Sequence, residues 1–384
     1  MREVVGSSPT AATLMKIAIF SDLPFGGASI ATQQLISHLS KKHQLKEFNL
    51  SFSVPQNRLL SDLYALTTAR RFQKKLARKI NPNFDLALIS HTRFFQAPWI
   101  LRYLTIPTAF LCQEPTRAFF EDFLKPKNLP LPNLIYEKTI RFIKRRIEIK
   151  NAQYPHIILA NSQFSTSQIY KAYGRKATPL LLGVDTKIFK PLSLPLKNQV
   201  LVVGNDEPQK NLDFAFQIIA SINESIRPVL VVVSPRQKNH FRLQKLAQKL
   251  DLKVKFYTQI STETLIKLYN QSIATLAVAI NEPFGLSVVE SMACGTPVLA
   301  VDEGGFKETV LDNQTGFLLP RDIYVFADKL TQLLYQSDLR AKFSVASRHH
   351  VLNHLTWGQT VNKLDKIITE IYNATHIVKM KEKN

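Results

Sequence analysis

Cysteine is scarce in this chain of 384 residues, which contains only Cys112 and Cys294, far apart in the sequence. Two distant cysteines exclude a disulfide framework and a cysteine-based metal cluster, and they favour a reducing compartment. Long hydrophobic runs are also lacking, since no apolar stretch approaches the roughly 18 residues that a membrane-spanning helix needs. A secretory signal peptide is not expected either, because the N-terminal residues contain no long apolar segment.

Acidic residues are few relative to basic ones, 29 against 50, which gives a net charge of +21. The excess is uneven, with +17 on residues 1–190 and +4 on residues 191–384. A strongly basic half predicts an anionic partner such as nucleic acid, phospholipid headgroups or a phosphorylated substrate. A solvated, lysine-rich surface is the alternative interpretation of the same composition.

Apolar residues make up 45% of the chain, enough for a large core. Short apolar runs alternate with helical patterns, which predicts parallel sheets with helices on both faces. Strands are expected at residues 17–20, 84–90, 107–112 and 156–162, and again at 199–204, 228–233, 254–258, 273–278 and 297–301.

The length of the chain suggests two domains, and the pattern is interrupted at residues 183–199, which lack a clear period. We therefore expect one domain at 15–190 and a second at 198–350, followed by a helical segment at 351–384. Residues 1–14 lack apolar periodicity and are interpreted as a non-native leader, with translation beginning at Met15. Tandem domains of this kind usually bind a ligand in the cleft between them.

The segment at residues 279–300, "AINEPFGLSVVESMACGTPVLA", contains two glutamates, Glu282 and Glu290, separated by seven residues. A strand is expected to end near Ala279, and a helix to begin near Leu286 and end at Gly295, a glycine suited to a C-cap. The turn between them would present helix N-terminal amides to an anion such as phosphate. The two carboxylates could accept hydrogen bonds from a polyol and from ribose hydroxyls. Alternatively, they are an ordinary turn residue and a charge on the helix surface.

The longer stretch "EPFGLSVVESMACGTPVLAVDEGGFKETV" resembles the E-x7-E motif of glycosyltransferase family 4, the retaining enzymes of the GT-B fold. The resemblance extends from Met15 to about Trp357. It implies an α/β architecture of two Rossmann-like, doubly wound parallel-sheet domains that face a cleft. It also implies a C-terminal helix that crosses back to the first domain.

The resemblance also assigns roles to individual residues. Glu282 and His91 would be the catalytic residues, with Glu282 orienting the donor sugar and His91 contacting it from the end of a strand. Glu290 would hold the ribose and Lys210 would face the pyrophosphate. The remaining donor-binding residues would be Gly26 and Gly27 in a glycine loop, and Phe284, Gly285 and Leu286 in the turn.

One departure from the family pattern concerns the second domain, where Asn205 stands in place of the usual arginine. Asparagine lacks the charged, bidentate guanidinium, so Lys210 and the turn amides would neutralise the pyrophosphate with less help. Family glycines after the next strand are replaced by "VVVSPRQ". Both departures leave the identity of the donor open and are compatible with weak or altered activity. Asn205 favours an alternative, a binding protein that has kept the fold and lost the activity.

The expected function is that of a metal-independent, retaining hexosyltransferase. It would transfer sugar from a UDP- or GDP-sugar without a cofactor, and the chain indeed contains no Asp-x-Asp motif. The acceptor would be a glycan or a polyprenyl- or lipid-linked sugar in cell-envelope polysaccharide or glycolipid synthesis. Alternatives are a nucleotide-sugar epimerase and a transferase that makes a soluble glycoside. A nucleic-acid partner is not expected, since no nucleic-acid-binding motif is present.

Acceptor binding is assigned to the basic first domain, where Arg117 could pair with an acceptor phosphate. Residues 69–79 and 137–150 each contain six basic residues. The second stretch has helical apolar spacing, which is typical of a basic amphipathic helix on an anionic membrane. A core-facing helix with a solvated basic face is the alternative. The expected location is cytoplasmic, at the inner face of the membrane.

Overall fold

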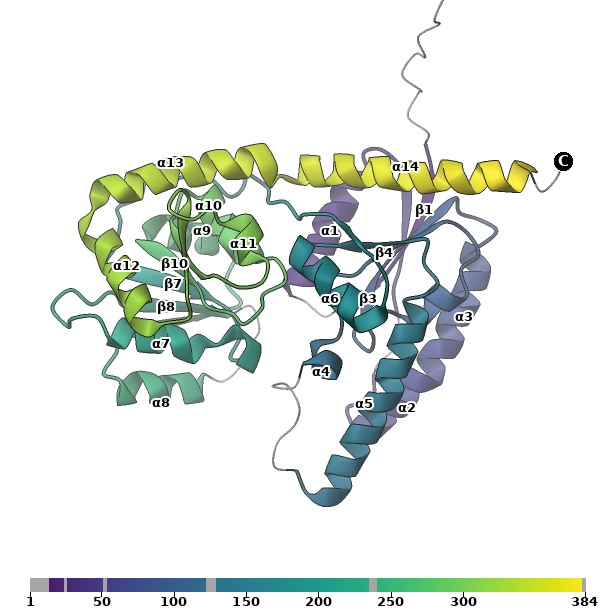
Figure 1. Cartoon of the computed structure of the whole chain (residues 1–384), viewed down its shortest axis with the longest axis horizontal. Helices are drawn as coiled ribbons and strands as arrows, with labels where there is room; N and C mark the ends of the chain where they lie inside the picture. Colours follow the sequence, from purple (N-terminus) through teal and green to yellow (C-terminus); the bar gives the residue numbers. More distant parts are fainter. Residues whose placement is uncertain (1–13, 24–25, 51–53, 122–128, 235–239, 382–384) are drawn as a thin grey trace, which may run out of the picture.

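The computed structural model describes residues 14–23, 26–50, 54–121, 129–234 and 240–381, without the side chains of 378–381. It contains two six-stranded sheets in which all strand pairs are parallel (Figure 1). The strand order is β2-β1-β3-β4-β5-β6 in the first sheet and β12-β11-β10-β7-β8-β9 in the second. Most of the proposed leader, and the segments "PF" at 24–25 and "PRQ" at 235–237, lie outside the described residues.

The first sheet is built around β3, in which all seven residues are buried, as expected for a central parallel strand. Its strands are β1 (Lys16–Asp22), β2 (Gln44–Phe48), β3 (Leu86–Thr92), β4 (Thr108–Leu111), β5 (Ile157–Ala160) and β6 (Thr178–Pro179). The helices in this half are α1 (Gly27–Leu39), α2 (Arg58–Leu66), α3 (Thr68–Ile80), η1 (Trp99–Arg102), α4 (Arg117–Phe120), α5 (Leu131–Asn151) and α6 (Gln163–Tyr173).

The second sheet has β7 at its centre, between β10 and β8. Its strands are β7 (Gln199–Val203), β8 (Val229–Ser234), β9 (Val254–Thr258), β10 (Ala274–Ala277), β11 (Val298–Val301) and β12 (Gly316–Leu319). The helices that follow are η3 (Pro208–Lys210), α7 (Leu212–Ala220), α8 (Phe241–Lys249), α9 (Thr262–Gln271), α10 (Leu286–Ala293), α11 (Phe306–Thr309), α12 (Ile323–Tyr335), α13 (Ser337–His354) and α14 (Trp357–Lys381).

All nine strands expected from the sequence are present, with ends that differ by a few residues. Three strands were not predicted: β2, β6 and β12. β2 and β6 lie at the edges of the first sheet and β12 at an edge of the second. β2 is polar and largely exposed, so it leaves no continuous apolar run in the sequence, whereas β12 is a four-residue apolar run, GFLL. β6 is only two residues long.

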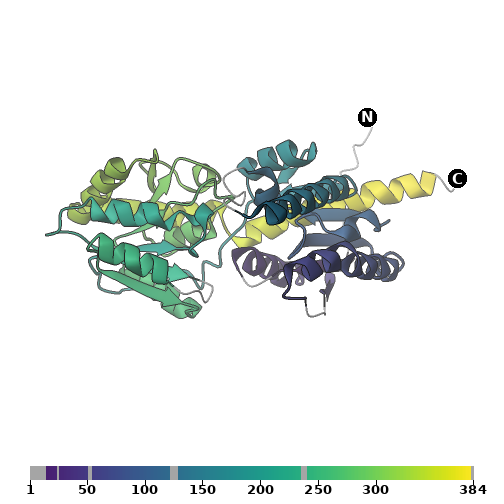
Figure 2. The same cartoon turned by 90° about the horizontal axis from the view of Figure 1, so that it is seen from below.

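The C-terminal helix α14 returns to the first half, as expected (Figures 1 and 2). It packs beside α1, and Asp365 accepts hydrogen bonds from Lys42 Nζ at 2.7 Å and bonds His43 Nε2 at 2.8 Å. No helix in the described residues is both long and apolar enough to cross a membrane.

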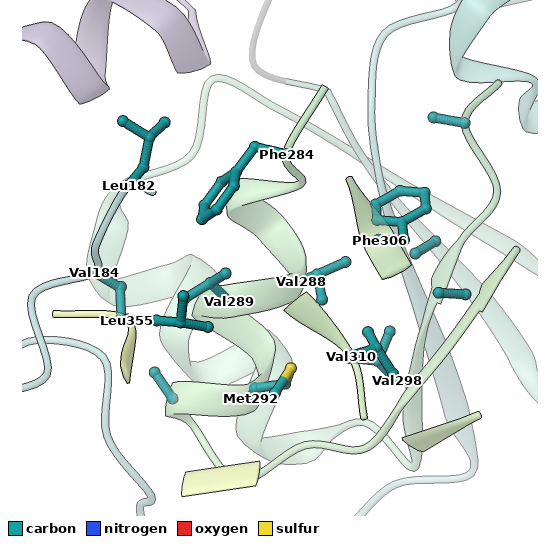
Figure 3. Packing of buried hydrophobic residues seen from close by; sticks show 14 of the residues in the cluster. Leu182, Val184, Phe284, Val288, Val289, Met292, Val298, Phe306, Val310 and Leu355 are labelled. Carbon is teal, nitrogen blue, oxygen red and sulfur yellow. The ribbon is translucent and has the colours of Figure 1, made fainter. Parts of the chain in front are cut away.

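An apolar cluster beneath the cleft fixes α10 in place (Figure 3). Val288, Val289 and Met292 of α10 are fully buried there, together with Val184 and Leu355 from segments far apart in the sequence. Burying each large apolar side chain contributes about 1.5–3 kcal/mol relative to exposing it. The start of α10 is therefore a rigid element that fixes the position of the preceding turn, residues 282–285, which we call the binding turn.

Candidate functional site

The turn before α10 has a backbone that only glycine tolerates at its last position. Gly285 has φ +91°, and a Cβ built on it would lie 2.6 Å from Cε1 of Phe306. The glycine pair beyond β11 packs under the same turn, since Gly305 donates its N–H to the carbonyl of Glu282 at 2.7 Å. A Cβ on Gly305 would lie 2.3 Å from the carbonyl oxygen of Pro283. These close approaches explain why the motif contains glycine at both places.

The helix α10 begins beside a recess that Ser287 of its first turn lines. The first N–H groups of a helix have no carbonyl partner within it and carry its positive dipole end. The Phe284 side chain is only 2% exposed and lies in the apolar core with Leu182 and Val289 (Figure 3), so only its backbone can serve a ligand. Leu286 meets the start of α1, because a Cβ on Gly27 would lie 3.9 Å from Leu286 Cδ1. Gly26 precedes α1 as its N-cap.

Lys210 and Glu282 form an ion pair at the mouth of a recess beside this turn. Lys210 Nζ lies 2.8 Å from Glu282 Oε2, although the two residues are 72 positions apart. The recess is lined by ends of β7 and β10, by Ser287 of α10 and by Phe306. Burial opposes the charge of Lys210, but the carboxylates of Glu282, Glu114 and Glu207 together outweigh it and raise the pKa of Lys210. A lysine that remains protonated can neutralise a diphosphate.

Glu290 lies one turn along α10 and faces α9 rather than this recess. Its Oε2 accepts a hydrogen bond from the hydroxyl of the buried Tyr269 at 3.0 Å. Burial raises the pKa of Glu290 to about 7, against the opposing effect of the Tyr269 hydrogen bond. This bond uses one lone pair, so a carboxylate here retains capacity for further hydroxyl donors.

His91 lies near the carboxyl end of β3 and is almost wholly buried. Its Nδ1 has no hydrogen-bond partner among the described residues. Burial lowers the pKa of His91 to about 4, so the imidazole is neutral at physiological pH. In that state it can hydrogen-bond a sugar hydroxyl but does not supply a positive charge.

The neutral state of His91 predicts a pH-dependent stability. Its pKa is about 4 in the folded chain against 6.5 for the ordinary group, so acidification favours the unfolded state. By proton linkage, about 2 kcal/mol of stability should be lost between pH 7 and pH 5 through this residue. Urea unfolding at the two pH values should therefore show a smaller loss for His91→Asn than for the wild type. The exposed His349→Asn serves as control, and equal losses in His91→Asn and wild type would contradict the assignment.

Arg117 is engaged within the protein, in contacts that sequence reasoning did not foresee. Its guanidinium makes two hydrogen bonds to Glu121, at 2.7 and 2.8 Å, and donates to the carbonyl of Ile280 at 3.0 Å. Ile280 belongs to the second half, so Arg117 links α4 to the segment before the binding turn. An acceptor phosphate would have to compete with these partners for the guanidinium.

Glu114 was missed by sequence reasoning, although it lies three residues beyond the end of β4, in "CQEP", on the carboxyl side of a strand. It lies 3.9 Å from Arg117 and lines a cavity shared by the two halves. Burial raises the pKa of Glu114 to about 7, with Arg117 opposing the rise and Glu282 adding to it. The cavity is also lined by Arg117, Glu121, Arg145 and Lys171, so it combines two carboxyl groups with three cations, of which Arg117 is paired with Glu121.

A second set of contacts joins the halves at the start of α6. Glu308, part of the quoted motif but without an assigned role, accepts hydrogen bonds from the backbone N–H groups of Gln163 and Phe164 at 2.7 and 2.8 Å. Its carboxylate thus occupies the N-terminus of α6, a favourable place for negative charge. Ser162 Oγ donates to the carbonyl of Pro283 at 2.5 Å. The binding turn is therefore held from both sides of the cleft.

Asn205 connects the ends of two strands, β7 and β8. It is buried, and its Oδ1 accepts a hydrogen bond from Ser234 Oγ at 2.8 Å. A guanidinium does occur nearby, on Arg242, but it is bound to Asp206 and Asp213. Lys210 is thus the side-chain cation that the structure places at the recess, within the part of the chain that it describes. In the same part, no cluster of three or more potential metal ligands is present.

Two parallel six-stranded sheets that meet across a cleft, with a terminal helix returning to the first, define the GT-B fold, and this prediction is confirmed. Sucrose-phosphate synthase from Thermosynechococcus elongatus has a similar structure, with a TM-score of 0.76 and 16% identity over 94% of this chain and all of that one. Alr3699/HepE from Anabaena, in complex with UDP-glucose, has a TM-score of 0.70 and 16% identity, over 93% of this chain and all of that one. At these identities the likeness is one of fold.

Comparisons of sequence find both a family model and related proteins. Residues 184–350 match the family model described as glycosyl transferases group 1. A D-inositol 3-phosphate glycosyltransferase from Corynebacterium diphtheriae is 34% identical over 236 residues, 55% of each chain. Another, from Thermomonospora curvata, is 29% identical over 252 residues, 57% of this chain and 58% of that protein. The chain thus spans little more than half the length of these curated relatives.

Proposed function

We propose that the protein is a retaining glycosyltransferase of family 4 that uses a nucleotide-sugar donor. The observation that carries the proposal is the Lys210–Glu282 pair beside the first turn of α10. It combines a cation, helix N-terminal amides and a carboxylate at one point, where the carboxyl ends of β7 and β10 meet. A nucleoside diphosphate sugar has a matching sequence of groups, with the diphosphate between two sets of hydroxyls.

Donor binding is proposed to place the diphosphate of a UDP- or GDP-sugar against Lys210 and the α10 amides. Glu290 would accept hydrogen bonds from the ribose hydroxyls, Glu282 would orient the sugar, and neutral His91 would hydrogen-bond it from the opposite side of the cleft. Gly26 and Gly27 would let the start of α1 approach the phosphates. Lysine and amide dipoles supply the positive potential that the leaving group needs, so no metal ion is required.

In the transfer itself, the bond between the anomeric carbon and the phosphate oxygen breaks while the acceptor oxygen bonds to the same face of that carbon. The acceptor proton passes to the departing phosphate. Lys210 stabilises the negative charge that develops on the diphosphate, which is the largest expected electrostatic contribution. Transfer of a hexose and retention of the anomeric configuration are proposed from the family resemblance.

The acceptor is proposed to be a glycan or a lipid-linked sugar of cell-envelope synthesis, used at the inner face of the cytoplasmic membrane. The cavity shared by Glu114, Arg145 and Lys171 supports an acceptor that carries hydroxyls and an anionic group. The Corynebacterium relative is named for a phosphorylated substrate, D-inositol 3-phosphate, which is consistent with an anionic group on the acceptor and equally with a transferase that makes a soluble glycoside. A binding protein without activity is the second candidate, favoured by the uncharged, internally bonded Asn205. An epimerase on the same fold is a third, and it would convert the donor without transferring the sugar.

Glu290→Ala should weaken the binding of free UDP or GDP, since the ribose loses a charged acceptor. Loss of hydrogen bonds to a charged group costs about 1.5–3 kcal/mol, or roughly 10- to 150-fold in affinity. Isothermal titration calorimetry measures this directly. Glu263→Ala removes an exposed α9 carboxylate paired with Lys267 and should leave the affinity unchanged. A folded Glu290→Ala variant that binds both nucleotides like the wild type would refute the ribose assignment.

A further inference from the structure

The helices α2 and α5 pair through buried polar contacts. Asp62 of α2 accepts a hydrogen bond from the Tyr136 hydroxyl at 2.7 Å and is bridged by Lys144. Glu137 of α5 is bridged by Arg58 and lies 3.3 Å from Arg141. Both carboxylates are buried, so the ion pairs form the seam between the two helices.

This seam leaves large apolar side chains of α5 on the outside. Leu131, Ile135 and Phe142 have exposed fractions of 70%, 57% and 57%. Spacings of four and seven residues place all three on one stripe of the helix. Lys138 and Arg146 are exposed and share this stripe by the same spacing, and the Arg146 guanidinium lies 5.0 Å from the centre of the Phe142 ring. We call these five residues the α5 stripe.

The partner helix α2 repeats the pattern. Leu59, Leu60 and Leu63 have exposed fractions of 61%, 53% and 56%, while Asp62 and Ala65 are the residues that it buries. Its apolar side therefore faces away from the protein, in reverse of an ordinary surface helix. The two helices extend together beyond the first sheet (Figure 1). Exposed apolar side chains on both helices of one projecting pair mark an interaction surface rather than a solvated one.

The charges on the stripe restrict the occupant. Lys138 and Arg146 have no ion-pair partner in the described part of the chain. A second copy of this chain would bring the same basic residues and the same positive half, which disfavours self-association. A surface that is both apolar and anionic can bury the exposed apolar side chains and attract the basic ones at the same time. We propose that the α2–α5 helix pair docks on an anionic lipid bilayer, with the α5 stripe and the α2 leucines entering its interface.

The proposal differs from the expectation drawn from residues 137–150 alone. Two of the basic residues in that segment, Arg141 and Lys144, are bound to Glu137 and Asp62 in the seam. Lys144 joins α5 to Asp62 of α2, whereas Arg141 is bound to Glu137 within α5 and to the carbonyl of Ala118, so neither is available to lipid. The surface instead begins at Leu131, and it includes a helix, α2, that sequence reasoning did not associate with the membrane.

Sedimentation with vesicles tests the proposal on the full-length protein. The wild type should bind vesicles of phosphatidylglycerol and phosphatidylcholine, bind less in high salt, and bind pure phosphatidylcholine weakly. Lys138→Gln/Arg146→Gln should weaken binding by about fivefold for each charge removed. Leu131→Ser/Ile135→Ser/Phe142→Ser should weaken it by at least tenfold, and Leu59→Ser/Leu60→Ser/Leu63→Ser similarly. Melting temperatures near that of the wild type will show that these variants fold.

A matched control replaces exposed apolar residues of the second half, Tyr324, Tyr335 and Val345, with serine, and should bind vesicles like the wild type. Nucleotide affinity should be unchanged in all these variants, which separates docking from the proposed transfer activity. The proposal would be overturned if the wild-type protein does not bind anionic vesicles, or if the α5-stripe variants bind them as the wild type does. A wild-type dimer in light scattering that the stripe variants abolish would assign the face to a second copy and overturn it equally.

Discussion

Lys210→Met should reduce the release of nucleoside diphosphate from a nucleotide-sugar donor by about 10²- to 10³-fold, the usual effect of removing one preorganised electrostatic contact to a developing charge. Lys210 is the cation at the recess, and Asn205 supplies no second one. The substitution keeps the length and apolar stem of the side chain. It also leaves Glu282, 2.8 Å away in the wild type, without its counter-charge, so the diphosphate will be repelled as well.

The double variant Lys210→Met/Glu282→Gln separates these two effects. Removing the repulsion should recover part of the affinity for UDP or GDP, whereas turnover should stay low because the cation is still missing. Lys267→Met, which breaks an exposed ion pair with Glu263, serves as the control and should be fully active. A Lys210→Met enzyme within a few-fold of the wild type would show that the leaving group is stabilised elsewhere.

Glu148→Leu should lower the free energy of unfolding by about 3 kcal/mol, because several buried donors lose their acceptor. Glu148 is fully buried in α5, and its Oε1 accepts hydrogen bonds from the N–H groups of Gln96 and Ala97 and from the hydroxyls of Thr116 and Tyr173. Burial raises the pKa of Glu148 to about 7, so its contribution should be largest in mild acid and decline as pH rises through 7.

Urea unfolding followed by tryptophan fluorescence measures this loss, since Trp99 lies near the residues that Glu148 holds. Glu148→Gln keeps a carbonyl oxygen as acceptor and should lose only about 1 kcal/mol. The free energy of unfolding should be highest for the wild type, lower for Glu148→Gln and lowest for Glu148→Leu. Because Thr116 precedes the helix that carries Arg117, the leucine variant should also weaken the acceptor side of the cleft. Equal urea midpoints for Glu148→Leu and the wild type would contradict the structural role given to Glu148.

The architecture could be predicted from the sequence because parallel strands that are buried on both faces consist of continuous apolar runs. β2 and β6 have no such run, since they lie at the edges of their sheet. Lys210 and Glu282 were each identified, but their contact spans 72 positions and depends on how β7 and β10 pair. Glu114 carries no local signal beyond its place after a strand. The basic segment at 137–150 shows the same limit, because composition does not reveal that Arg141 and Lys144 face buried carboxylates.

The most direct test of the central claim is the release of nucleoside diphosphate from a panel of UDP- and GDP-sugars in the presence of EDTA, with water or a lipid extract as acceptor. The account predicts release from at least one donor, at a rate that chelation does not change, and loss of that release in Lys210→Met. Failure of a folded protein to release nucleoside diphosphate from any of these donors, or release that appears only after a divalent ion is restored, would contradict it.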